Sequence, residues 1–153
     1  MEKIESFKVN HLKLYSGLYV SRIDRFEQTT ITTFDLRFAA PNKEEPMQVP
    51  AMHTLEHLGA TFFRNSKIKD KVVYFGPMGC RTGFYLLLAN EWTPIELFPL
   101  MIEFLDFVLE FNSKIPGASP IECGNYLEQD LNTAKLYAKK YKEDLISYKR
   151  FEY

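Results

Sequence analysis

The sequence predicts an α+β fold, in which an antiparallel β-sheet is packed against helices on one face. Alternating apolar residues indicate strands in the first part of the chain, and an apolar stripe at helical spacing follows Pro50. Two helix-start signals then occur, at Thr93 and Ser119. The resulting order of strands, helix, strands and two helices is typical of α+β proteins. With 153 residues, 46% of them apolar, we expect one domain over residues 1–153 with a buried core.

The clearest strand pattern covers Thr29–Phe38. Its phenylalanine and leucine residues alternate with Asp35 and Arg37, which is the period of a half-buried strand. We therefore expect these two charged residues on the face opposite the core, where a strand arginine is more often simply solvated. The prolines and charges of Pro41–Pro46 indicate a loop after this strand.

The remaining elements follow from periodicity and from helix-start signals. The apolar stripe predicts a helix from about Pro50 to Asn65, and Val72–Phe75 and Thr82–Ala89 indicate two more strands. A Thr-Pro-Ile-Glu capping box predicts a helix over Thr93–Phe111, with an internal proline that should kink it. The same device, Ser-Pro-Ile-Glu, predicts a last helix over Ser119–Leu145.

Charge and termini restrict the class of function. A formal net charge of -1 gives no electrostatic case for binding nucleic acid or anionic membranes. No apolar run reaches membrane-spanning length, and the start of the chain lacks the apolar core of a secretory signal. We therefore expect a cytoplasmic protein, where thiols stay reduced. Cys80 and Cys123 are then candidates for metal or proton chemistry rather than for a disulfide.

The sharpest local motif is His53-Thr-Leu-Glu56-His57, an H-x-x-E-H pattern on a predicted helix. At the helical step, His57 lies ~40° round from His53 and Glu56 lies ~60° the other way. Both imidazoles can therefore reach one metal ion, with the carboxylate beside it. The alternative is two ordinary surface histidines. Because the chain has only three histidines, we favour the metal site.

A catalytic metal usually has three protein ligands and one open position. Cys123 is the better third ligand, because the predicted helix from Ser119 places it in a first turn, where the helix dipole favours the thiolate. The alternative is a small buried apolar residue, which is the usual fate of a free cysteine.

Cys80 lies in a turn between Gly76 and Gly83, where glycines and a proline tighten the backbone. Functional side chains are common at such places, and the neighbouring Arg81 would help to lower the thiol pKa if it points toward the sulfur. The alternative is a packed cysteine in a hairpin turn, and the spacing alone leaves both open.

Five separated motifs occur in order along nearly the whole chain: Glu5-Ser6-Phe7 with His11, Phe34–Phe38 with Pro41-Asn42, His53–His57, Gly76–Gly83, and Cys123-Gly124. Together they resemble the S-ribosylhomocysteine lyase (LuxS) family, the source of the autoinducer-2 precursor. The resemblance implies that His53, His57 and Cys123 bind one divalent metal. It also implies that Glu56 and Cys80 are the acid–base residues.

The resemblance further implies substrate contacts from Ser6, His11 and Arg37, and a homodimer whose active sites lie at the subunit interface and are built from both chains. It favours Fe(II) as the metal, for which Zn(II) or Co(II) can substitute. The chain departs from the family pattern at three positions that bear on substrate contacts, namely Thr33, Tyr74 and Gly76.

The reaction implied is cleavage of S-ribosylhomocysteine to homocysteine and 4,5-dihydroxy-2,3-pentanedione. The thioether leaves by β-elimination, which requires a carbonyl next to the proton that is removed. Two isomerisations must therefore move the sugar carbonyl from C1 to C3 before the elimination. A divalent Lewis acid stabilises the enediolate of each shift, and Cys80 and Glu56 on either side of the metal would transfer the protons.

Two alternatives remain at this point. H-x-x-E-H is also the inverzincin motif of zinc peptidases, in which Glu56 would activate water. That interpretation leaves the Cys80 and Cys123 motifs unexplained. A non-enzymatic module with a structural metal would need four protein ligands, and His11 or Cys80 would have to complete the set.

Overall fold

The computed structural model describes residues 2 and 4–153, without the side chains of Glu5 and Ser6. Its centre is a four-stranded antiparallel sheet with the strand order β1-β2-β4-β3. The strands are β1 (Gly17–Phe26), β2 (Thr29–Arg37), β3 (Val72–Pro77) and β4 (Gly83–Ala89). All three strands expected from the sequence are present, and β1 completes the sheet.

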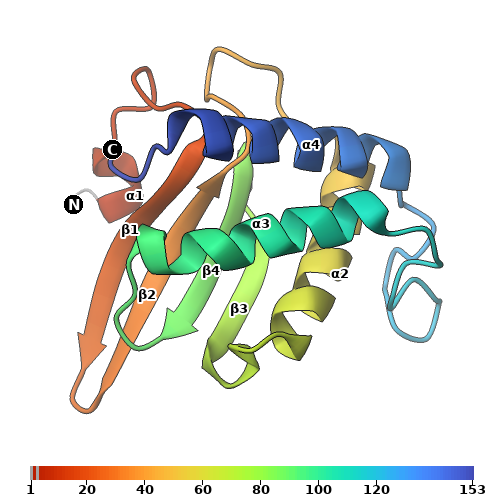
Figure 1. The fold of residues 1–153 in the computed structure, drawn as a ribbon, viewed down its shortest axis with the longest axis horizontal. Helices are drawn as coiled ribbons and strands as arrows, with labels where there is room; N and C mark the ends of the chain where they lie inside the picture. Colours follow the sequence, from red (N-terminus) through yellow and green to blue (C-terminus); the bar gives the residue numbers. More distant parts are fainter. Residues whose placement is uncertain (1, 3) are drawn as a thin grey trace.

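The helices are α1 (Glu5–Lys8), α2 (Val49–Asn65), α3 (Pro94–Glu110) and α4 (Leu131–Tyr148), with a single 3₁₀ turn η1 (Lys69–Lys71). In Figure 1, α3 and α4 run side by side across the sheet, and α2 lies next to β3. The α+β prediction is thus confirmed. Not one of the helices described is long and apolar enough to cross a membrane.

The core lies between the sheet and the three long helices. Phe34 and Leu36 of β2 are fully buried, and so are Leu55 and Leu58 of the stripe predicted for α2. Burial of such side chains contributes roughly 1.5–3 kcal/mol each. This stripe fixes which side of α2 faces the sheet, and it therefore also fixes where the His53 side of the helix points.

The capping box at Thr93 forms as predicted. The Thr93 hydroxyl accepts a hydrogen bond from the Glu96 backbone N–H, and the Glu96 carboxylate accepts one from the Thr93 backbone N–H. Pro94 occupies the first turn, where its missing N–H costs nothing.

The second predicted capping box does not start a helix, so that prediction is wrong. The Ser119 hydroxyl does contact the Glu122 carboxylate, and the Cys123 backbone N–H donates to the Ser119 carbonyl at 2.9 Å, but only one turn results. Ile121 is 96% exposed, so the segment has no apolar side with which to pack. A cap without a buried stripe does not stabilise a long helix.

Helix α4 begins instead at Leu131, and Asp130 caps it by accepting from the Thr133 backbone N–H at 2.9 Å. From there Ala134, Ala138, Tyr141 and Leu145 supply the fully buried stripe. Cys123 is therefore in a loop before α4 and not in the first turn of a helix.

Asp35 and Arg37 lie on the strand face opposite Phe34, as alternation predicts, but that face is not solvated at this point. Their exposed fractions are 2% and 3%. Asp35 is paired in register with Tyr19 of β1 and Tyr85 of β4, so an aromatic residue flanks it on each side. The expectation of a solvated arginine is wrong for this strand.

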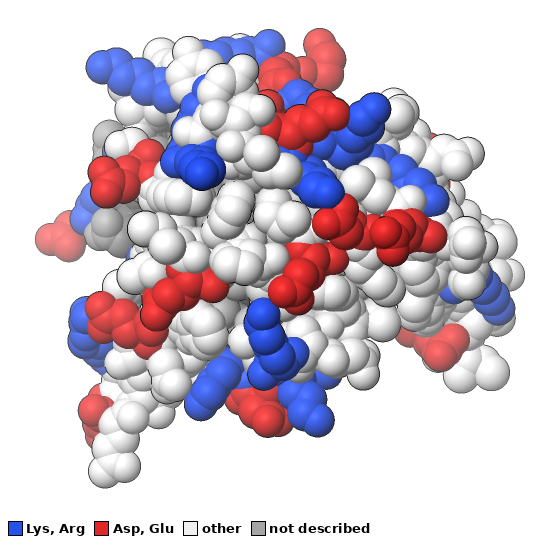
Figure 2. All heavy atoms as spheres, viewed as in Figure 1, with Lys and Arg blue, Asp and Glu red and all other residues white. Residues whose placement is uncertain are grey.

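Charges are interspersed on the face that carries α3 and α4. Figure 2 shows lysine and arginine side chains alternating with aspartate and glutamate there, without an extended patch of either sign. This agrees with the formal net charge of -1. This face therefore lacks the basic stripe that nucleic-acid binding requires.

Candidate metal centre and active site

His53, His57 and Cys123 come together at one point of the structure. Helix α2 places the two Nε2 atoms 3.0 Å apart, and the Cys123 Sγ lies 3.4 Å from the His53 Nε2. The three ligand atoms all lie within 4.8 Å of one another. This is the geometry of a site that could hold one metal ion, assembled from one turn of helix and one loop.

Both imidazoles are held with their Nε2 atoms free to coordinate. The His53 Nδ1 lies 2.8 Å from the Glu128 carbonyl and the His57 Nδ1 lies 2.7 Å from the Pro116 carbonyl. A carbonyl only accepts, so each Nδ1 must carry the hydrogen. Two Nε2 lone pairs then face each other at 3.0 Å, which is repulsive unless a cation, a proton or a metal ion, lies between them. Backbone orientation of this kind is typical of metal-ligating histidines.

A glycine allows the loop to approach His57. Gly117 has φ +73°, and a Cβ at this position would lie 3.1 Å from the His57 Nδ1. The left-handed backbone and the narrow gap both favour glycine. Gly117 therefore contributes to the placement of the neighbouring Pro116 carbonyl against the imidazole.

The Cys123 sulfur receives a backbone hydrogen bond from the loop rather than from a helix terminus. The Asn125 N–H donates to Sγ at 3.4 Å. The sulfur thus accepts a hydrogen bond within its own loop. The predicted donor, the first turn of a helix from Ser119, is absent.

Glu56 is half-buried and lines a cavity of about 380 Å³ together with His53 and Arg81. Among the described residues, no hydrogen bond or ion pair is found for its carboxylate, and the group of possible ligands does not include it. Glu56 is therefore placed beside the metal ligands with its carboxylate available to exchange a proton.

Cys80 lies in the turn between β3 and β4, and its side chain is exposed. The turn is closed by hydrogen bonds from the Met78 N–H to the Gly83 carbonyl and from the Arg81 N–H to the Met78 carbonyl, both 2.9 Å. Arg81 has φ +58° and lines the Glu56 cavity. Among the described residues, the cation found in contact with the thiol is not Arg81.

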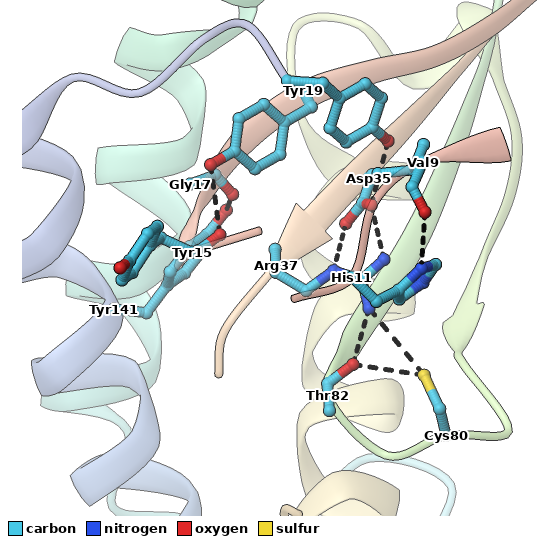
Figure 3. Close-up of polar contacts among 11 residues, drawn as sticks. Val9, His11, Tyr15, Gly17, Tyr19, Asp35, Arg37, Cys80, Thr82 and Tyr141 are labelled. Atoms are coloured by element: carbon cyan, nitrogen blue, oxygen red, sulfur yellow. Dashed lines mark hydrogen bonds and ion pairs between the residues drawn. The ribbon is translucent and has the colours of Figure 1, made fainter. Parts of the chain in front are cut away.

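That cation is Arg37 of β2. Its Nη1 lies 3.8 Å from the Cys80 Sγ and donates to the Thr82 Oγ1 at 2.6 Å, and the Thr82 Oγ1 lies 3.1 Å from the same sulfur (Figure 3). Because the Thr82 oxygen accepts from Arg37, its own hydrogen can be donated to sulfur. The Cys80 sulfur therefore has a cation and a hydroxyl donor within reach.

Arg37 is fixed by a buried, two-point ion pair. Its Nε and Nη2 donate to the two carboxylate oxygens of Asp35 at 3.0 and 2.6 Å. Burial raises the pKa of Asp35 above its usual value, although Arg37 lowers it. Burial would lower the pKa of Arg37, but the Asp35 carboxylate outweighs this and raises it. Arg37 is therefore a permanent cation, held in one orientation.

The thiol and the metal ligands face different cavities of the chain. Cys80, Thr82 and His11 line a second cavity of about 390 Å³, closed by the loop Pro41–Pro46. No residue that lines it also lines the cavity containing His53 and Glu56. The neighbours of Cys80 in the turn, Gly79 and Arg81, line the metal cavity, whereas the thiol itself lines the other one.

Of the three expected substrate contacts, His11 and Arg37 lie on the Cys80 side of the site. His11 lines the Cys80 cavity and its Nδ1 donates to the Val9 carbonyl at 2.9 Å. Arg37 reaches Cys80 from β2. Ser6 lies in α1, and its side chain falls outside the described part of the structure.

Sequence reasoning missed Thr82 and the buried role of Asp35. The spacing Asp35-x-Arg37 on one strand face was a usable signal, because residues at i and i+2 point the same way. The carbonyl partners of the histidines, at Pro116 and Glu128, had no signal in the sequence because any residue offers a carbonyl.

The model of the S-ribosylhomocysteinase (LuxS) family matches residues 4–152. The chain belongs to the S-ribosylhomocysteinase (LuxS) family. A S-ribosylhomocysteine lyase of Clostridium beijerinckii is 52% identical over 147 residues, covering 95% of this chain and 92% of that protein. The lyase of Clostridium acetobutylicum is 50% identical, covering 100% and 99%, and that of Borreliella burgdorferi is 47% identical, covering 97% and 96%.

Two of the three positions at which the sequence was expected to depart from the family, Tyr74 and Gly76, are linked in space. A Cβ at Gly76 would lie 2.0 Å from the Tyr74 hydroxyl, so the tyrosine occupies the space of a side chain at position 76. The third, Thr33, has a buried hydroxyl for which the described chain offers no hydrogen-bond partner. Tyr74 and Thr33 line one small cavity, with Tyr85.

Proposed function

We propose that this protein is a metal-dependent carbon–sulfur lyase that cleaves S-ribosylhomocysteine to homocysteine and 4,5-dihydroxy-2,3-pentanedione, the autoinducer-2 precursor. Family membership and the names of the relatives support the substrate. The observation that carries the chemistry is the convergence of His53, His57 and Cys123 with both Nε2 atoms free to coordinate.

These three residues would hold one divalent metal and leave a position open for the substrate. Bound there, the metal would polarise the carbonyl and hydroxyl oxygens of the sugar. Fe(II) is our first choice, with Zn(II) or Co(II) as substitutes, because two imidazoles and a thiolate suit all three. The set of nearby ligand atoms contains no carboxylate and no fourth member among the described residues, which speaks against both the peptidase and the structural-site alternatives.

Cys80 and Glu56 are the proposed proton carriers. A thiolate beside Arg37 and Thr82 can take a proton from carbon, and a carboxylate without a partner can exchange one with oxygen. Ser6, His11 and Arg37 are the proposed substrate contacts. Arg37 would act as a fixed cation, because its guanidinium is held at one end by Asp35 and at the other by Thr82.

We also propose that two copies of the chain build each active site. Cys80 and the metal ligands face different cavities, so a homodimer would join the Cys80 cavity of one copy to the metal cavity of the other. The N-terminal segment that contributes His11 to the Cys80 cavity also carries exposed apolar side chains available for such an interface, including Phe7 (70% exposed) and Leu12 (71% exposed). Each copy would be a single catalytic domain, residues 1–153, in the reducing cytoplasm, where an exposed catalytic thiol stays reduced.

The activity is tested by adding S-ribosylhomocysteine to metal-loaded protein and assaying free homocysteine thiol. Release of homocysteine supports the proposal, and its absence with full metal loading contradicts it. Omitting the substrate controls for the protein's own thiols.

The shared site is tested by complementation. Co-expressed Cys80→Ala and His57→Ala chains should regain about a quarter of the parent activity, because half of randomly formed dimers are mixed and one of their two sites is intact. Glu56→Gln with His57→Ala is the matched control, since both changes fall on the metal side and no intact site can form. Equal, negligible activity in both mixtures would refute the shared site.

A further inference from the structure

The Asp35 carboxylate has a third partner besides the two nitrogens of Arg37. The Tyr153 hydroxyl donates to Oδ2 at 3.0 Å, the same oxygen that accepts from the Arg37 Nη2 at 2.6 Å. Oδ1 accepts from the Arg37 Nε at 3.0 Å. Asp35 is 2% exposed, so these bonds replace water at a buried charge. Tyr153 therefore completes the solvation of the ion pair.

The position of Tyr153 is itself defined by β1. Its ring stacks on that of Tyr19, with centroids 4.8 Å apart and planes 19° from parallel. Tyr19 is the in-register partner of Asp35 across the β1–β2 ladder. The segment after α4 is tied to the same strand, because the Leu18 N–H donates to the Arg150 carbonyl at 3.0 Å. The hydroxyl is thus brought to Asp35 by stacking and by backbone hydrogen bonding.

The other end of the Arg37 guanidinium meets the thiol. Figure 3 shows the guanidinium between Asp35 on one side and Thr82 and Cys80 on the other. A two-point pair fixes both the distance and the plane of the guanidinium relative to its carboxylate. A change in how Asp35 is held is therefore passed on to the Nη1 that lies 3.8 Å from the Cys80 Sγ.

We propose that Tyr153 is a positioning residue of the active site, whose hydroxyl fixes Asp35 and thereby holds the Arg37 guanidinium beside the Cys80 thiol. The inference rests on the proposed role of Cys80 as a proton carrier. Burial and the nearby Asp35 raise the pKa of the Tyr153 phenol far above its usual value. The hydroxyl therefore stays protonated, and so donates to Asp35, well above neutral pH.

The titratable and charged groups that face Cys80 come from four segments. Arg37 approaches from β2 and His11 from the segment after α1, and Tyr85 of β4 is close enough to interact electrostatically with the thiol. The loop Pro41–Pro46 contributes Lys43, Glu44 and Glu45 to the same cavity. Replacing Tyr153 by phenylalanine changes none of these groups. A shift in the thiol pKa in that variant thus reports on the placement of Arg37 relative to sulfur.

The test is the pH dependence of alkylation of Cys80 by iodoacetamide in metal-loaded protein, followed on the Cys80 peptide by mass spectrometry. For Tyr153→Phe we expect the thiol pKa to rise by about half a unit, so that alkylation at pH 7 slows about threefold. Metal content should stay at the parent value. In the homocysteine assay, the same variant should show a lower kcat with little change in KM.

Tyr148→Phe is the matched control. This tyrosine is 59% exposed, and its ring lies against Arg150, with the guanidinium carbon 4.0 Å from the centroid. It should alkylate as the parent does. An unchanged or lower thiol pKa in Tyr153→Phe, or an equal shift in Tyr148→Phe, would overturn the inference. Because alkylation needs no turnover, this result is independent of whether S-ribosylhomocysteine proves to be the substrate.

Discussion

The metal group and the Cys80 group are built in opposite ways. The two histidines come from one turn of α2 and are oriented by backbone carbonyls. The thiol comes from a turn and is contacted by the side chains of Arg37 and Thr82, and Arg37 is itself held by the side chain of Asp35. Backbone partners survive most substitutions, whereas side-chain partners can be removed one at a time. Metal binding and proton transfer should therefore respond to separate sets of mutations.

The largest expected effects separate the two groups. His57→Ala removes one of three ligands, so tight metal binding and homocysteine release should be lost together. Cys80→Ala should keep the metal and lose turnover, whereas Cys123→Ala should lose both. Metal analysis of purified variants alongside the homocysteine assay checks this. Loss of metal in Cys80→Ala would mean that the roles of the two cysteines are exchanged.

Glu56 lines the metal cavity but is assigned to proton transfer. A change at this residue therefore tests whether a neighbour of the metal ligands can be altered without loss of the metal. Glu56→Gln keeps shape and hydrogen-bonding reach while removing the basic carboxylate. The variant should fold and bind metal, and homocysteine release should fall by at least ~10²-fold. If Cys80 performs some steps alone, a ketone intermediate still joined to homocysteine should accumulate and be visible by carbon-13 NMR of labelled substrate. Release at the parent rate would rule out the role.

A smaller effect is expected from Gly117, which acts on the metal group only through the loop. In Gly117→Ala the added Cβ meets the His57 Nδ1 at 3.1 Å on a left-handed backbone, so the Pro116 carbonyl must shift. Loss of a partner that orients a ligand typically costs ~10-fold or more in metal affinity. Competition with a chelator measures this. The Cys80 alkylation rate should stay unchanged, and a matching change there would contradict the independence of the two groups.

Local spacing was sufficient to predict the histidine pair. Positions i and i+4 meet on any helix, and the apolar stripe that forms α2 also fixes its orientation. The capping box at Thr93 was equally local, and it formed with its proline in the first turn. These features depend on residues within a few positions of one another.

The same capping motif at Ser119 was not sufficient to predict a helix. Its hydrogen bonds form, yet no helix follows, because Ile121 and its neighbours have no core surface to cover. The apolar residues that bury a helix face begin only after Asp130. Whether a cap starts a helix is therefore decided by packing against the rest of the molecule.

By itself the sequence determined the α+β class, the H-x-x-E-H turn of helix and the family, because each depends on short-range spacing or on motifs read in order. Only the tertiary structure decided that Arg37, rather than the adjacent Arg81, accompanies Cys80, and that Tyr153 reaches Asp35. Strand pairing brings together residues that lie far apart in the chain, and no local pattern encodes which cation ends beside which sulfur. The tertiary structure also placed the Cys80 thiol in a cavity with His11, whereas its neighbours Gly79 and Arg81 line the cavity of His53 and Glu56, because the two sides of one turn contact different parts of the chain.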